Sequence, residues 1–229
     1  ASAVDNLREE ISALLSVAGE GDEVLIRLES AGGVVHGYGL AASQLRRIRD
    51  HGVKLTVSVD KVAASGGYMM ACIADQIIAA PFAVLGSIGV AAQIPNFNRL
   101  LKSQNIDVEM HTAGEYKRTL TMLGENTEAG REKFLAELED VHELFKAFVA
   151  ENRPKVDVAA VGTGEAWYGR RALERQLVDV LMTSDEYVIK KLKDFAVYEV
   201  KYEIQQGKFE QAMKRFSALS TQWPVRQKI

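Results

Sequence analysis

Ser65 lies in a position suited to a nucleophile, among small residues between a predicted strand and a predicted helix. Leu55 to Val59 form an apolar run typical of a strand, and Gly66 and Gly67 follow Ser65 directly. The glycines allow backbone amides to come close to a bound carbonyl. If a helix begins here, its unpaired amides and its dipole favour an oxyanion beside the hydroxyl. The pattern is typical of a nucleophile, although a serine in this position is also a common helix N-cap.

A serine nucleophile needs a base, and the spacing leaves the choice open. His111, at the end of a predicted strand, is the best histidine candidate. Lysine serves as a base where burial favours its neutral amine, and Lys61 and Lys117 are both candidates. Surface positions are expected for the remaining histidines, which are His36, His51 and His142.

A second turn could also hold an anion. The residues Ser30 to Gly33 follow a predicted strand at 24–28 and precede a predicted helix at 36–50. Backbone amides exposed at such a glycine turn can form an anion-binding nest. The alternative is a plain strand-to-helix turn. Neither a phosphate-binding loop nor a dinucleotide fingerprint is present here.

Composition indicates a globular protein with no nucleic-acid partner. The chain has 229 residues, of which 47% are hydrophobic and 26% charged, and its 28 basic and 31 acidic residues give a net charge of −3. A nucleic-acid-binding protein would carry a basic excess. Cys72 is the only cysteine, so no intrachain disulfide can form, and its apolar neighbours predict a buried structural thiol.

One uncharged stretch, Gln76 to Asn98, is long enough to cross a bilayer. Pro81, Gly86 and Pro95 interrupt it, and the apolar runs between them have the length of strands, so we expect short buried strands joined by turns. The chain begins with Ala1 instead of Met. We therefore expect a trimmed fragment, before which a signal or a membrane anchor could stand.

Apolar periodicity predicts a single α/β domain. Helices are predicted over 1–18, 36–50, 97–103, 128–151, 156–164, 169–175 and 184–195, with another starting near Ser65. Strands or extended pieces are predicted over 24–28, 54–59, 106–111, 166–168, 178–181 and 198–204. Strand, glycine turn and helix follow one another twice, so both turns should lie at the carboxyl ends of neighbouring parallel strands. The domain is predicted over 1–216, including a last helix near Phe209, with a polar tail at 217–229.

Three stretches resemble the core signature of the signal peptide peptidase A family of bacterial serine peptidases: Ala63 to Tyr68, Ala74 to Ile77, and Gly86 to Val90. The glycine turn, the loop from Gly114 to Lys117, and the stretch from Tyr168 to Asp179 also match, so the likeness covers nearly the whole chain. It is strongest to the shorter, single-domain branch. That branch contains periplasmic proteases anchored to the inner membrane.

The resemblance implies that Ser65 is the nucleophile and Lys117 the general base of a Ser/Lys dyad. It further implies an oxyanion hole from the amides of Gly33 and Gly66, and a site also lined by Ser87, Gly32 and Gly67. The implied fold is a crotonase-like, Clp-protease-like superhelix of ββα units. Neither a cofactor nor a metal is expected. Members assemble into rings or domes whose dyads can be shared between subunits, so we expect a homo-oligomer on the periplasmic side of the inner membrane.

The implied function is that of a serine endopeptidase that hydrolyses hydrophobic peptides such as released signal peptides. Two alternatives stay open. One is a catalytically inactive ring-forming scaffold, and the other is a crotonase-type acyl-CoA enzyme, which would need a carboxylate pair at the site. The chain departs from the family pattern at Ala31, where members usually have proline, and at Gln176, where glycine is common.

Overall fold

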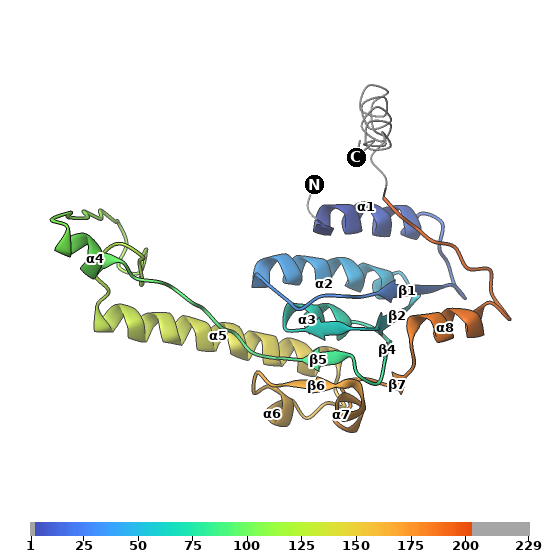
Figure 1. The fold of residues 1–229 in the computed structure, drawn as a ribbon. Helices are drawn as coiled ribbons and strands as arrows, with labels where there is room; N and C mark the ends of the chain where they lie inside the picture. Colours follow the sequence, from blue (N-terminus) through green and yellow to red (C-terminus); the bar gives the residue numbers. More distant parts are fainter. Residues whose placement is uncertain (1–2, 203–229) are drawn as a thin grey trace, which may run out of the picture. The chain divides into compact units, whose positions relative to one another are not determined.

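The fold is built on a parallel sheet, seen in a computed structural model that describes residues 3–202 (Figure 1). Four strands lie in the order β1-β2-β4-β7, all parallel: β1 Glu23–Arg27, β2 Lys54–Val59, β4 Gln76–Ala79 and β7 Val180–Leu181. Five of the six residues of β2 are buried, as expected for a central strand covered on both faces. This confirms the predicted α/β class with parallel strands.

A second, smaller sheet carries the chemistry-bearing turns. It consists of β3 Val62–Ala64, β5 Val84–Gly86 and β6 Ala166–Tyr168, with β3 and β5 parallel and β6 antiparallel to β5. The chain passes directly from β2 into β3, and it returns from β4 into β5 after a short turn. Ser65 therefore lies at the carboxyl end of β3, and Ser87 lies at the carboxyl end of β5.

Three helices pack on each other beside these sheets. They are α1 Ala3–Leu15, α2 Val35–Asp50 and α3 Gly66–Ala71, with α2 in contact with both of the others. The buried positions of α2 recur at helical spacing: Ala41, Ala42, Leu45 and Ile48. Every residue of α3 is buried, so the backbone after Ser65 is held by packing on all sides.

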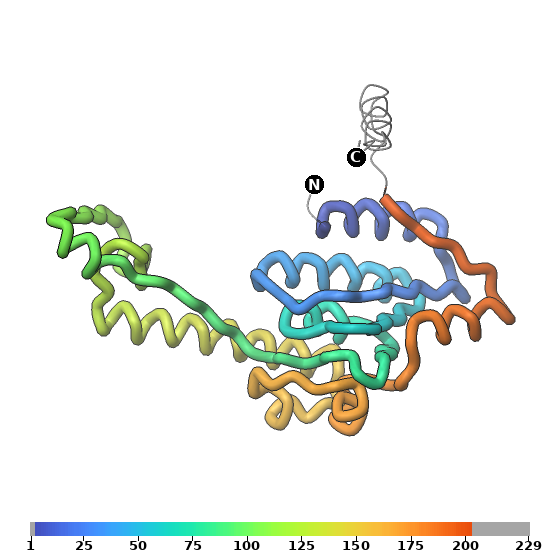
Figure 2. The backbone as a smooth tube through the Cα atoms, viewed as in Figure 1, coloured from blue at the N-terminus to red at the C-terminus, as the bar shows by residue number. Residues whose placement is uncertain are grey.

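The remaining helices follow after β5. Figure 2 traces the extended chain from β5 to α4 Asn98–Ser103, from which a loop leads into the 25-residue helix α5 Glu128–Asn152. Thr127 caps α5 by accepting a hydrogen bond from the Gly130 amide over 3.1 Å. The chain then forms α6 Val158–Val161, α7 Gly169–Glu174 and α8 Ser184–Lys191.

Most elements predicted from periodicity are confirmed within one or two residues at their ends. The uncharged stretch from 76 to 98 forms β4, β5 and an extended segment, as predicted, and within residues 3–202 there is no helix with the length and apolarity that a bilayer span requires. Of the described residues, 3–198 form one compact unit. The predicted boundary at 216, the last helix and the tail lie outside the described residues.

Two predicted strands are wrong in the part of the chain described here. Residues 106–111 and 198–202 form no strand, and most of their side chains are exposed, including Tyr198 with an exposed fraction of 83%. Alternation of apolar and polar residues predicts a strand only where a neighbouring strand supplies hydrogen bonds and a core covers one face. Within residues 3–202, neither segment has such a neighbour.

One carboxylate ties the edge of the parallel sheet to α8. Glu23, at the start of β1, accepts hydrogen bonds from Thr56, Tyr187 and Lys191 and pairs with Lys54 at 3.3 Å. Burial raises the pKa of this carboxyl, but the hydrogen bonds from Lys191 and its neighbours outweigh burial and lower the pKa from 4.5 to about 2. The ionised form of Glu23 therefore stabilises the fold.

We predict that Glu23→Gln lowers the free energy of unfolding at pH 7 by about 2–3 kcal/mol. Because the folded pKa of Glu23 lies below its unfolded value, its contribution is present above pH 4.5 and is lost as the pH falls towards 2. The difference between wild type and variant, measured by denaturant unfolding, should therefore shrink across this range. Glu29→Gln is the control: it breaks an exposed pair with Lys61 and should cost less than about 0.5 kcal/mol. A pH-independent difference for Glu23→Gln would contradict the prediction.

Candidate active site

Ser65 sits in a strained backbone conformation with a free hydroxyl. Its φ of 53° and ψ of −121° lie in a region that residues with side chains rarely adopt, at a cost of about 1–3 kcal/mol. The Ser65 amide donates to the Gly86 carbonyl over 2.8 Å, and the Ser65 carbonyl accepts from Met69 over 3.0 Å. Although Ser65 occupies the N-cap position of α3, its side chain makes no capping hydrogen bond. The alternative of a simple N-cap serine is therefore not supported.

The glycine turn lies directly against Ser65. A Cβ atom placed on Gly32 would come within 2.7 Å of the Ser65 Cβ and within 2.9 Å of the Gly66 nitrogen. Ser30 forms a parallel bridge with Ala63, and the Ala64 amide donates to the Ser30 carbonyl over 3.0 Å. Hydrogen bonds thus hold the turn after β1 against β3, the strand that precedes Ser65. Only a residue without a side chain fits at position 32, where φ is +97°.

Two glycines with unpaired amides line the same small pocket as Ser65. Gly33, Ser65 and Gly66 line this pocket together. Within residues 3–202, neither the Gly33 amide nor the Gly66 amide has a hydrogen-bond acceptor. Unpaired amides beside a free hydroxyl can hold the oxygen of a carbonyl that the hydroxyl attacks.

The rest of the pocket is apolar. Its walls come from the α2 start, from α3, from the segment after β5 and from α5: Val35, Met69, Gly89, Val90, Val141 and Phe145. No carboxylate lines this pocket, so the pair that an acyl-CoA enzyme would need is missing from its walls. An extended apolar chain segment fits this environment better than a charged ligand.

Ser87 also lies beside the site. It follows Gly86, whose carbonyl accepts a hydrogen bond from the Ser65 amide. The Ser87 amide donates to the backbone carbonyl of Glu165 over 2.6 Å. Its φ of 51° is again in the left-handed region, and its side chain is half-buried. Trp167 packs against Gly86, where a Cβ would come within 2.8 Å of its ring. The structure therefore brings Ser65, Gly66, Gly67, Gly32, Gly33 and Ser87 together, and their roles in the site stay a prediction.

Lys117 is not brought to Ser65 within one chain. It lies exposed in the arm, which we define as residues 98–127, comprising α4 and the loop into α5. The carbonyl of Thr119 touches Gly130 near the start of α5, whereas Val141 of α5 lines the Ser65 pocket. Those 11 residues of helix span about 17 Å. Figure 1 shows the arm at the end of α5 that lies away from α3.

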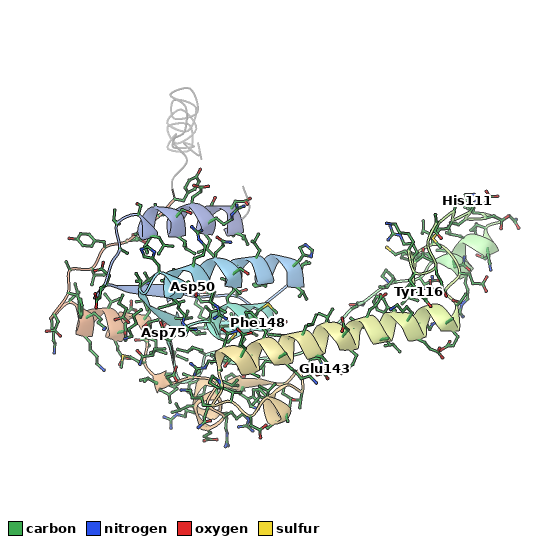
Figure 3. The ribbon with its side chains drawn as sticks, turned by 180° about the vertical axis from the view of Figure 1, so that it is seen from behind. Asp50, Asp75, His111, Tyr116, Glu143 and Phe148 are labelled. Atoms are coloured by element: carbon green, nitrogen blue, oxygen red, sulfur yellow. The ribbon has the colours of Figure 1, made fainter. Side chains whose placement is uncertain are left out.

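The other candidate bases do not reach Ser65 either. His111 and Tyr116 both lie at the arm end of α5, as Figure 3 shows, and His111 is 87% exposed beside Glu109. Lys61 is exposed and pairs with Glu29 at 3.0 Å. The predicted surface role of His142 is wrong: its ring is half-buried and its Nε2 lies 3.2 Å from the Ile88 carbonyl. The predictions for His36 and His51 are confirmed, since both side chains are exposed.

Sequence reasoning missed Tyr38, which supports both glycine amides. A Cβ on Gly66 would overlap the Tyr38 ring, and one on Gly33 would come within 3.0 Å of it. The Tyr38 hydroxyl also bonds Ser30 and the Gly32 carbonyl. The only signal in the sequence is an aromatic residue between two glycines near the start of a helix, and that pattern does not reveal what the ring contacts.

We predict that Gly67→Ala lowers the free energy of unfolding by about 2–3 kcal/mol, because the new methyl group would overlap the Ser30 carbonyl oxygen. Gly37→Ala is the matched control in α2. It has open space around its Cβ position and should be neutral or stabilising by up to about 1 kcal/mol. Denaturant unfolding of both variants checks this. Equal stability of the two would show that the turn and α3 are not in close contact.

Comparison with known proteins agrees with these features. The family model described as "Peptidase family S49" matches residues 47–197, and the one described as "Peptidase family S49 N-terminal" matches residues 1–45. The chain is 60% identical to "Probable protease SohB" of Haemophilus influenzae, over 90% of this chain and 59% of that protein. It is 61% identical to "Probable protease SohB" of Buchnera aphidicola subsp. Acyrthosiphon pisum, over 88% of this chain and 60% of that protein.

A more distant relative is "Protease 4" of Haemophilus influenzae, 27% identical over 73% of this chain and 27% of that protein. The chain spans about three fifths of the length of the SohB relatives that it matches. The resemblance predicted from the motifs is confirmed, because one family model alone covers well over half of the chain. The chain belongs to peptidase family S49.

Proposed function

We propose that the chain is the catalytic part of a serine endopeptidase in which Ser65 is the nucleophile. The observation that carries this proposal is a free hydroxyl on a strained turn, in one pocket with two unpaired amides. The Ser65 oxygen attacks the scissile carbonyl, and the resulting oxyanion accepts hydrogen bonds from Gly33 and Gly66. Collapse of this intermediate breaks the peptide C–N bond and leaves an ester on Ser65, which water then hydrolyses.

The proton of Ser65 passes, in this proposal, to the partner subunit's Lys117. The arm holds Lys117 away from the Ser65 pocket of its own chain, so a Ser/Lys dyad requires a second copy. The arm exposes large apolar side chains, as a surface that meets another subunit does: Leu100, Ile106, Met110, Tyr116, Met122 and Leu123. At this contact the Lys117 amine would take the proton of Ser65 and pass it to the nitrogen of the leaving amine.

Hydrophobic peptides, such as released signal peptides, are the proposed substrates. The apolar walls formed by Met69, Val141 and Phe145 support this choice. The finer fold assignment, a crotonase-like and Clp-protease-like superhelix of ββα units, is supported by the way β2 and β3 continue each other across two sheets before α3. The likeness to the periplasmic, membrane-anchored branch supports a location on the periplasmic side of the inner membrane.

Hydrolysis of an apolar fluorogenic peptide by single variants and by their mixture tests the proposal. Ser65→Ala and Lys117→Ala should each lower kcat by at least about 10³-fold. If the two variants are unfolded and reassembled together in equal amounts, one site in four receives an intact Ser65 and an intact Lys117. The mixture should then recover about a quarter of wild-type activity, provided that subunits mix at random.

Lys102→Ala is the control for Lys117→Ala. Lys102 lies in the same arm, where it pairs with Glu125 at 2.8 Å, and its loss should leave kcat within about twofold of wild type. Full activity in Lys117→Ala would rule out this lysine as the base. Assembly without any turnover by the wild type would favour the inactive scaffold.

A further inference from the structure

A closed ring of hydrogen bonds begins and ends on Gly32. The Gly32 amide donates to Ser30 Oγ over 3.3 Å, Ser30 Oγ lies 2.7 Å from Tyr38 Oη, and the Tyr38 hydroxyl donates to the Gly32 carbonyl over 3.1 Å. A tyrosine hydroxyl has one proton, and a carbonyl can only accept. The Ser30 hydroxyl therefore donates to Tyr38. All donors in the ring run in one direction, so each bond polarises the next.

This ring holds the peptide group that joins Gly32 to Gly33. The carbonyl of that group is bound by Tyr38, and its N–H is the Gly33 amide, one of the two proposed oxyanion donors. A peptide group is planar, with C=O and N–H pointing in opposite directions. Fixing the Gly32 oxygen on the Tyr38 side therefore fixes the Gly33 N–H on the other side. Since Gly32 has a φ of +97° and no side chain, little else restrains rotation of this group.

The Tyr38 ring also sets the position of the second donor. Its face lies against the Cα of Gly66, close enough that an added Cβ would overlap it, and its edge lies near Gly33. One side chain thus contacts the backbone of both amides. Ser30 contributes the other side chain of the ring, and its backbone is held to β3 because the Ser30 amide donates to the Val62 carbonyl over 2.9 Å.

We propose that Tyr38 is a positioning residue for the oxyanion hole, which keeps the Gly33 amide turned towards Ser65 and prevents the peptide from rotating to present its carbonyl instead. This inference rests on the proposed function. It predicts that loss of the hydroxyl weakens binding of the transition state while binding of the substrate is unchanged.

Steady-state hydrolysis of an apolar fluorogenic peptide and inhibition by a peptide boronic acid, both with the assembled chain, test the inference. The boronic acid forms a tetrahedral adduct with a serine hydroxyl and so reports on the oxyanion hole. In Tyr38→Phe, kcat should fall by about 10–100-fold with KM within about twofold of wild type. The affinity for the boronic acid should fall by the same factor as kcat.

Two further variants separate positioning from general stability. Ser30→Ala opens the same ring from its other end, so it should reproduce the loss, and the double variant should be within about threefold of either single one. Tyr68→Phe is the matched control. Tyr68 is fully buried and its hydroxyl donates to the Leu177 carbonyl over 3.0 Å, outside the site, so kcat should stay within about twofold.

The outcomes distinguish the two proposals. If the wild type hydrolyses the peptide but Tyr38→Phe loses no more kcat than Tyr68→Phe, the inference about Tyr38 is wrong and the proposed function stands. A change confined to KM, with unchanged affinity for the boronic acid, would also overturn it. If the wild type neither hydrolyses the peptide nor binds the boronic acid, the proposed function is wrong. If Tyr38→Phe does not fold, the kcat of Ser30→Ala and its affinity for the boronic acid test the inference instead.

Discussion

The site depends on one close approach of two backbone segments, with a glycine on one side of each contact. Gly32 lies against Ser65 and Gly66, and Gly67 lies against the Ser30 carbonyl. Any Cβ at these places would push the turn after β1 away from the start of α3. Their contact puts the two unpaired amides beside the hydroxyl. The strain at Ser65 persists because the buried α3 and the bond to Gly86 hold its backbone.

The chain separates the groups that the proposed reaction needs. The core supplies the hydroxyl and the Gly66 amide beside the buried helix α3, and the turn after β1 supplies the Gly33 amide. The arm carries Lys117 on a solvent-exposed loop at the other end of α5. In the proposed function, a single chain therefore folds most of its site without being able to activate it. In the proposed function, assembly switches the peptidase on.

Local patterns predicted a large part of this structure. The periodicity of α2 and α5 and the apolar run of β2 follow directly from burial, and the glycines beside Ser65 and after Ser30 marked both turns. Tyr38 could not be predicted, because its role depends on which backbone its ring meets after folding. Spacing could not choose Lys117 as the base either, since its position relative to Ser65 is set by the length of α5 and, in the proposed function, by a second chain. Alternating apolar and polar residues at 106–111 and 198–202 predicted strands wrongly, because no neighbouring strand pairs with them within residues 3–202.

The most direct test of the central claim is the crystal structure of the assembled protein after reaction with a serine-directed peptide phosphonate. The account predicts a phosphorus–oxygen bond to Ser65, with the free phosphoryl oxygen about 2.7–3.1 Å from the amides of Gly33 and Gly66. It also predicts the partner subunit's Lys117 amine within hydrogen-bond reach of the Ser65 oxygen. A label on another residue, or a phosphoryl oxygen turned away from both amides, would contradict it.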